Sequence, residues 1–257
     1  MRSIFIFIIA GALAAGSAFG QSPATVERDI LVQLKNVDKF ASYSGSFDEE
    51  KLDAANSAVR DLLVKNGDRL DVLQYGFPKL KDEMYIATSP DGKLRIYSWD
   101  LETGGTMHDY DEVFQYQATG GQVHTWTAPS GDDQRGGGYY TQIFQVDAKS
   151  GPIYLANSNF IAQGTIHGQS IEGIRISGDK LDVKAKVIRT ARGLTNSVDF
   201  AYDPSSLGNR SEKLISFDGA KQQFTFPVVV EDKTYENGRV TSRLITYRFN
   251  GEVFVKV

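Results

Sequence analysis

Beyond Met84, apolar and polar residues alternate along several segments, and this alternation limits the fold more than any other feature of the chain. It is clearest in residues 180–186, 224–230, 245–249 and 253–257. Successive side chains of a strand point to opposite faces, so such segments form strands that cover a core with one face only. We therefore predict a large antiparallel β-domain over residues 81–257, built as a sandwich, a barrel or a curved open sheet.

Short glycine-containing pairs between these segments predict tight hairpin turns, because glycine and asparagine tolerate the positive φ angles that such turns need. They are Asp91-Gly92, Gly120-Gly121, Asp218-Gly219, Asn237-Gly238 and Asn250-Gly251. From the last of them we expect residues 253–257 to form a strand that pairs with residues 244–249.

The stretch SPDGKLRIYSWD, residues 89–100, resembles the sequence of one blade of a β-propeller. Propellers repeat their blade signature about every 40–50 residues, whereas this stretch occurs once. We therefore predict a single hairpin of strands 84–88 and 93–99. In the second strand, Leu94 and Ile96 share one face and Tyr97 and Trp99 the other, which indicates that neither face simply meets solvent.

Residues 21–80 show the spacing of apolar residues that is typical of helices instead. Apolar residues recur every three or four positions from Val26 to Val37, which predicts an amphipathic helix. Ser46 and Glu49 stand at the spacing of a capping box, and Gly67 fits a left-handed helix stop, so we predict a second helix between them. The expected class is α+β, mainly β, with an N-terminal helical pair before the β-domain.

Residues 1–20 read as a cleaved signal peptide. Arg2 precedes an apolar run over residues 4–13, and Ala18-Phe19-Gly20 places small residues where a signal peptidase cuts. The run is too short to span a bilayer. We expect a periplasmic or secreted, bacterial protein without a stable membrane anchor after cleavage. The chain contains no cysteine, which excludes disulfides and thiolate chemistry.

Composition and missing motifs exclude several function classes. The formal charge of −4 offers no basic surface for nucleic acid. No GxSxG or phosphate-binding loop motif is present, so we predict no cofactor and no serine nucleophile. Five residues have side chains that could bind a metal ion, but their spacing matches no known metal-site motif, so we predict no metal site. They are His108, Asp109, Asp111, His124 and His167. We expect His124 to stack beside Trp126.

The segment 99–140 carries most of the candidate binding residues. Residues 129–138 read as a long polar loop on a rigid sheet, and such loops commonly recognise proteins. We therefore expect a non-enzymatic binding protein, with an inhibitor or immunity-type protein directed at a hydrolase or toxin as one form. The candidate binding residues are Trp99, Tyr110, Trp126, Asp132, Asp133, Arg135, Tyr139 and Tyr140.

Two alternatives stay open. The first is a carbohydrate-active hydrolase, which needs two carboxylates in an open cleft lined by aromatic side chains. Its acids would come from Asp100, Glu102, Asp109, Asp111 and Glu112, with Trp99, Tyr110, Tyr116 and Trp126 as stacking surfaces for a glycan. Sequence spacing does not show whether these acids form a catalytic pair. The second alternative is a structural component of the cell envelope.

Overall fold

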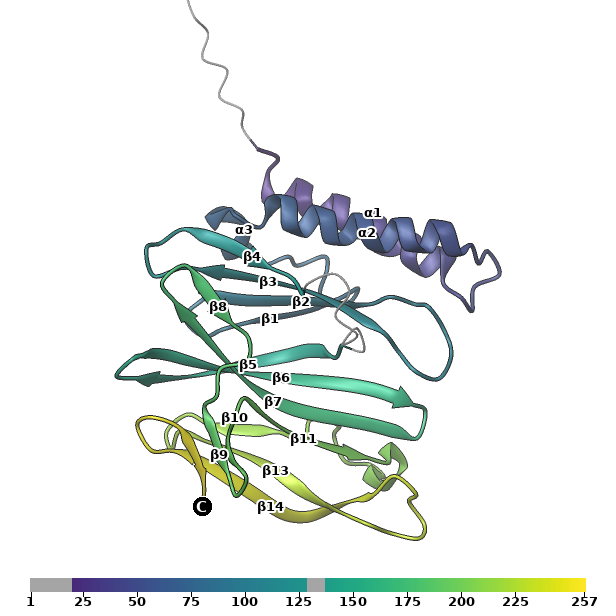
Figure 1. Ribbon diagram of the computed structural model, residues 1–257. Coiled ribbons are helices and arrows are strands. Elements are labelled where there is room, and N and C mark those ends of the chain that lie inside the picture. Colours follow the sequence, from purple (N-terminus) through teal and green to yellow (C-terminus); the bar gives the residue numbers. More distant parts are fainter. Residues whose placement is uncertain (1–19, 129–136) are drawn as a thin grey trace, which may run out of the picture.

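The computed structural model describes residues 20–128 and 137–257. Two N-terminal helices cover a first β-sheet, and a second and a third sheet are stacked beneath it, so the fold has four layers (Figure 1). The predicted class, a helical pair followed by a large, mainly antiparallel β-structure, is confirmed. Among the described residues, no sheet closes into a barrel.

The helical layer consists of α1 (Pro23–Phe40), α2 (Glu49–Asn66) and the short α3 (Leu70–Gln74). The side chain of Ser22 caps α1 by accepting a hydrogen bond from the Thr25 amide, and Pro23 occupies the first turn, where no backbone donor is needed. The predicted apolar stripe of α1 is buried against the rest of the molecule. Within the described residues, no helix combines the length and the apolar character needed to cross a membrane.

The ends of α2 differ from the sequence prediction. Asp48 caps the helix by accepting a hydrogen bond from the Lys51 amide, whereas the Ser46 hydroxyl donates to the Lys39 carbonyl at the end of α1. An aspartate directly before the helix is as good a cap as a serine, so the capping-box prediction was wrong by two residues. Gly67 ends α2 with φ −76°, a right-handed conformation and not the left-handed one expected.

Sheet 1 has the strand order β1 (Tyr85–Thr88), β2 (Leu94–Asp100), β3 (Tyr110–Gln117) and β4 (Val123–Trp126). The stretch at 89–100 is a hairpin between β1 and β2, as predicted. Its turn is fixed locally, since the Ser89 hydroxyl donates to Asp91 Oδ1 at 2.7 Å, and from below, since the Tyr154 hydroxyl donates to Asp91 Oδ2 at 2.9 Å.

Both faces of β2 are buried, as its sequence indicated. Tyr97 and Trp99 pack against the helices, whereas Leu94 and Ile96 pack against sheet 2. Sheet 1 is thus an internal layer, and the helices leave only its lower face for a site.

Sheet 2 has the order β11 (Ser197–Tyr202), β7 (Ile166–Ser177), β6 (Gly151–Gln163) and β5 (Tyr139–Ala148), with β8 (Lys180–Asp182) paired to the end of β7. The strand expected over residues 180–186 is therefore shorter than its pattern, because the chain turns away from β7 after Asp182. Sheet 2 is covered by sheet 1 on one face and sheet 3 on the other.

Sheet 3 has the order β10 (Gly193–Thr195), β9 (Ile188–Thr190), β15 (Phe254–Lys256), β14 (Arg239–Phe249), β13 (Gln223–Val230) and β12 (Ser216–Asp218). A short 3₁₀ helix, η1 (Pro204–Leu207), lies between β11 and β12 in the chain. The predicted pairing of the last strand with β14 is confirmed. β15 also pairs in parallel with β9, which was not predicted and which places the C-terminal strand inside the sheet.

Candidate functional site

The residues predicted to bind a ligand separate into distinct places. Trp99 is only 1% exposed and lies in the core between the helices and sheet 1. Its indole Nε1 donates a 3.0 Å hydrogen bond to Asn56 Oδ1 on α2. Its ring therefore joins two layers of the fold, and we leave Trp99 out of the candidate site.

Tyr110 and Tyr139 belong to an aromatic cluster with Tyr85. The rings of Tyr85 and Tyr139 stack with their centroids 4.0 Å apart, and Tyr110 packs against Tyr139 at 4.9 Å. This cluster lies beside a cavity on the sheet 3 face of sheet 2. The candidate loop residues Asp132, Asp133 and Arg135 lie outside the described residues.

Trp126 and Tyr140, by contrast, meet in a cleft between sheets 1 and 2, which we call the intersheet cleft. It has a volume of about 790 Å³. Phe114 connects the two residues, because its ring makes edge contacts with Trp126 at 5.2 Å and with Tyr140 at 5.6 Å. The aromatic residues along the cleft are Phe114, Trp126, Tyr140 and Phe160.

The register of the strands in sheet 2 determines which side chains form the floor of the intersheet cleft. Tyr140, Ser158, Ser170 and Asp199 stand opposite one another on β5, β6, β7 and β11, so their side chains point to the same face. The two central positions are serines, which are too small to fill the space beneath Phe114 and Trp126. The intersheet cleft therefore exists because small polar side chains occupy the middle of this face of sheet 2.

Two glutamates, Glu112 and Glu172, line the cleft. Glu172 lies two residues after Ser170 on β7 and accepts a hydrogen bond on each oxygen, from the Tyr140 hydroxyl at 2.9 Å and from the Ser170 hydroxyl at 2.6 Å. Glu112 reaches the cleft from β3 in sheet 1. Both oxygens of the Glu172 carboxyl group are therefore held by hydroxyl groups of sheet 2.

Glu112 has a very different environment. Burial, and next the negative charge of Glu172, raise the pKa of its carboxyl group to about 8. Asp111 adds to this effect, whereas Arg60 opposes it. At neutral pH the carboxyl group of Glu112 therefore keeps its proton. A protonated carboxyl group in the same cleft as a second carboxyl group is a usual arrangement of an acid and a base in catalysis.

The other acids of the predicted cluster have structural partners. Asp100 accepts from His108 Nδ1 at 2.5 Å, and Asp111 forms an ion pair with Arg60 on α2. Only Glu112 of these acids lines the intersheet cleft. Tyr116, a predicted stacking surface, donates its hydroxyl to the Asp179 carbonyl at 2.8 Å instead.

The histidines do not converge. His124 packs against the Tyr116 ring at 5.7 Å, not against Trp126 as expected, because Tyr116 stands directly opposite it on β3. His108 lies at the end of sheet 1, and His167 lies on β7 beside Tyr202. In residues 20–128 and 137–257, no three histidine or acidic side chains are grouped so that they could hold a metal ion.

Glycine permits the close packing at one end of the cleft. A Cβ atom on Gly138 would clash with the Asn159 carbonyl and the Ser158 hydroxyl, and one on Gly137 would stand 3.2 Å from the Tyr110 carbonyl. These two glycines therefore let the start of β5 lie against both sheets. The sequence analysis placed both glycines in the long polar loop of residues 129–138.

The comparisons give no relative from which a role could be transferred. No family model, curated protein or solved structure matches the chain. The intersheet cleft must therefore be interpreted from its own chemistry. Sequence reasoning missed Glu172, although one signal was present. Ser170 and Glu172 are polar residues on one face of β7, where Ile166 and Gly168 precede them and Ile174 and Ile176 follow them.

Proposed function

We propose that the protein is an exported, carbohydrate-active hydrolase whose reaction takes place in the intersheet cleft. The observation that carries the proposal is the pair of carboxyl groups in the cleft, Glu112 and Glu172. The raised pKa of Glu112 keeps it protonated at neutral pH, and the Glu172 carboxyl group is held by the hydroxyl groups of Tyr140 and Ser170. Glycoside hydrolysis needs this combination, namely an acid for the leaving oxygen and a second carboxylate that acts as a base or a nucleophile.

The environments assign the roles. Glu112, with a pKa of about 8, holds its proton until the glycosidic oxygen accepts it. Glu172 is held in place by the hydroxyl groups of Tyr140 and Ser170, and it would accept a proton from water or attack the sugar carbon. Because the two residues come from different sheets, the substrate would lie between the sheets.

The remaining walls suit a glycan. Trp126 and Phe160 are partly exposed in the cleft and offer faces to the C–H side of a sugar ring. Asp182, Lys184 and Asp199 are exposed at the rim, where polar groups can contact sugar hydroxyls. The combination of apolar walls with a few convergent polar groups is characteristic of small-molecule sites.

Hydrolysis of glycans by purified protein tests this proposal directly. We would incubate residues 21–257 with purified peptidoglycan and with a panel of α- and β-linked oligosaccharides, and measure new reducing ends. We expect turnover that falls about 100-fold or more in Glu112→Gln and in Glu172→Gln. Glu50→Gln, an exposed change on α2, is the matched control and should leave turnover unchanged.

Two outcomes would reject the hydrolase. Absence of turnover on every glycan together with absence of binding would remove the cleft as a carbohydrate site. Binding without turnover, weakened in Glu112→Gln, would make the cleft a lectin-like site instead.

The alternative of an inhibitor or immunity-type protein rests on the loop that contains Asp132, Asp133 and Arg135, which lies outside the described residues. It stays a prediction with its own test. Replacement of residues 130–136 by a Gly-Ser linker should abolish capture of a hydrolase or toxin without lowering the melting temperature.

A further inference from the structure

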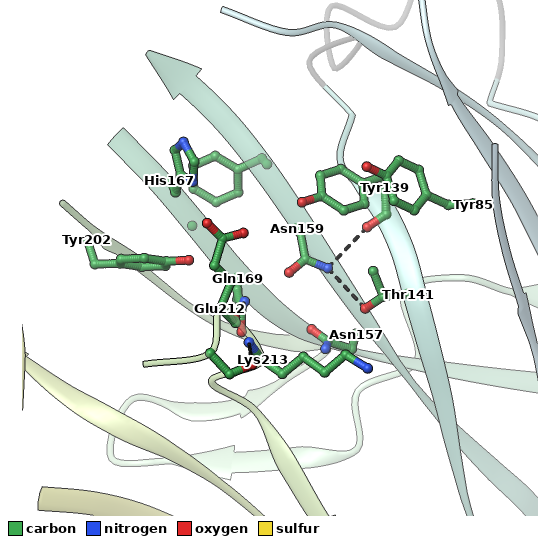
Figure 2. A pocket seen from close by; sticks show the side chains of 13 residues that line it. Tyr85, Tyr139, Thr141, Asn157, Asn159, His167, Gln169, Tyr202, Glu212 and Lys213 are labelled. Carbon is green, nitrogen blue, oxygen red and sulfur yellow. Dashed lines mark hydrogen bonds between the residues drawn. The ribbon is translucent and has the colours of Figure 1, made fainter. Parts of the chain in front are cut away.

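A second cavity lies on the opposite face of sheet 2 and shares only Phe160 with the intersheet cleft. Figure 2 shows the side chains that line it. Its volume is about 330 Å³, at the lower end of the range for small-molecule sites. Side chains of β5, β6, β7 and β11 form its wall, and residues 211–213 and Tyr85 close it from the sides. We call it the tyrosine–amide pocket.

The pocket has a polar wall because the residues on one face of β6 change from apolar to polar along the strand. Ile153, Leu155, Asn157 and Asn159 alternate along β6, so their side chains point to the same face. The first two belong to the core between sheets 2 and 3, whereas the two asparagines line the pocket. The sheet face therefore becomes polar while it remains buried.

β7, which is antiparallel to β6, changes from apolar to polar toward the same end of the sheet. Ile171 lies in the core, whereas Gln169 and His167 line the pocket beside the asparagines of β6. Gln169 stands opposite Asn159 across the two strands. The polar side chains at these four positions of β6 and β7 are not needed for packing, because apolar side chains fill the core on the rest of the same sheet face.

Two acceptor atoms in the wall lack partners. Asn157 is 4% exposed and Gln169 is 3% exposed. Asn157 Oδ1 and Gln169 Oε1 are fully buried and, within the part of the chain that the structure describes, neither accepts a hydrogen bond. The Gln169 amide is held in place on its other side, since Nε2 donates to the Glu212 carbonyl at 2.5 Å. Buried acceptors without donors destabilise a fold unless something else supplies the donors.

The other walls are aromatic. The stacked pair of Tyr85 and Tyr139 lies on one side of the pocket, and Tyr202 and His167 lie on the other (Figure 2). Burial raises the pKa of the Tyr202 hydroxyl to about 12 and that of the Tyr139 hydroxyl further. Both phenols are therefore neutral at physiological pH and can donate hydrogen bonds.

The charges at the pocket balance. Glu212 and Lys213 are the exposed charged residues that line it, one of each sign. A neutral ligand is therefore favoured over an ion. The ligand must also donate at least two hydrogen bonds and present an apolar face to tyrosine rings.

We propose that the tyrosine–amide pocket binds a neutral pyranose, with two of its hydroxyl groups donating to Asn157 Oδ1 and Gln169 Oε1 and one ring face lying on the tyrosines. A single sugar ring combines adjacent O–H donors with an apolar C–H face, which is the combination that this lining requires. The site is independent of Glu112 and Glu172, because those residues act on the other face of sheet 2.

Binding of free monosaccharides tests the proposal. We would titrate residues 21–257 with glucose, galactose, mannose and N-acetylglucosamine, using saturation-transfer NMR and calorimetry. We expect at least one of them to bind, and its dissociation constant to rise about tenfold or more in Asn157→Leu and in Gln169→Leu, which remove the acceptors at nearly constant volume. Glu50→Gln, an exposed change on α2 outside both cavities, is the matched control and should leave this dissociation constant unchanged.

The opposite results would overturn the proposal. No binding of any of the four sugars would do so, as would equal affinities in wild type and both leucine variants. If circular dichroism showed a leucine variant to be unfolded, Tyr85→Ala would replace it, since Tyr85 is 40% exposed and its loss should leave the fold intact. An unchanged sugar affinity in Tyr85→Ala would then count against the site.

Discussion

The Tyr140 hydroxyl donates a 2.9 Å hydrogen bond to Glu172 Oε2, and this bond joins β5 to β7 beneath the intersheet cleft. Tyr140 is buried and its backbone amide donates to the Ser98 hydroxyl on β2 at 2.9 Å, so the same residue also connects sheet 2 to sheet 1. The position of the Glu172 carboxylate therefore depends on the packing of both sheets.

Substitution of Tyr140 by phenylalanine tests this dependence. We expect Tyr140→Phe to lower the free energy of unfolding by about 1–3 kcal/mol, because a half-buried carboxyl group loses one of its two donors. Urea denaturation measures the change. Tyr235→Phe, in a loop without a side-chain hydrogen bond of this kind, is the control and should cost less than about 0.5 kcal/mol. Equal effects of the two substitutions would show that the bond to Glu172 contributes nothing.

The raised pKa of Glu112 predicts a pH-dependent stability. An unfolded chain releases this proton near pH 4.5, whereas the folded protein holds it up to about pH 8. Between these values the folded state binds more protons than the unfolded state, so the free energy of unfolding should fall as the pH rises from 5 to 8. Thermal unfolding across this range measures the effect.

Glu112→Gln provides the comparison for that pH series, because a glutamine cannot release the proton. Its melting temperature should fall less between pH 5 and pH 8 and should exceed that of the wild type above pH 8. If both proteins followed the same curve, the carboxyl group of Glu112 would be ionised throughout. Any hydrolysis by the wild type should also decline above pH 8, as the acid loses its proton.

The hydrogen bond between Trp99 and Asn56 predicts a strong link between the helices and sheet 1. Asn56 Nδ2 also donates to the Leu101 carbonyl at 2.9 Å, so Asn56→Ala leaves two buried groups without a partner. We expect a loss of about 2–4 kcal/mol in the free energy of unfolding. Asn36→Ala on α1, whose amide only contacts a neighbouring glutamine, should cost far less. A small effect at Asn56 would mean that the helical layer is held by apolar packing alone.

Local features of the fold could be predicted from sequence, because they depend on neighbouring residues. The turns at Gly92 and Gly251 have positive φ angles, and each joins paired strands as expected. The order of strands in the sheets could not be predicted, because β15 beside β9 depends on contacts between residues far apart in sequence. The pair of Glu112 and Glu172 was missed for the same reason, since only sheet stacking brings them together.

The signal-peptide prediction can be tested by the mass of the exported protein. Cleavage after Gly20 leaves 237 of the 257 residues, beginning at Gln21. When the full chain is expressed in a Gram-negative host, we expect the periplasmic fraction to contain this species by intact-mass spectrometry. Replacing Ala18 and Gly20 by bulky residues should block processing, because signal peptidase needs small side chains there. A full-length protein found only in the cytoplasm would contradict export.

The C-terminal strand supplies the last prediction. Phe254 is fully buried and packs on Phe224 and Phe249, and β15 is hydrogen-bonded to a strand on each side. Removal of an internal strand exposes two edges and part of the core between sheets 2 and 3, so deletion of residues 252–257 should unfold sheet 3. The milder change Phe254→Ala should cost about 3–5 kcal/mol, whereas Val257→Ala, at an exposed position, should cost almost nothing. An unchanged melting temperature for the deletion would show that β15 does not hold the sheet together.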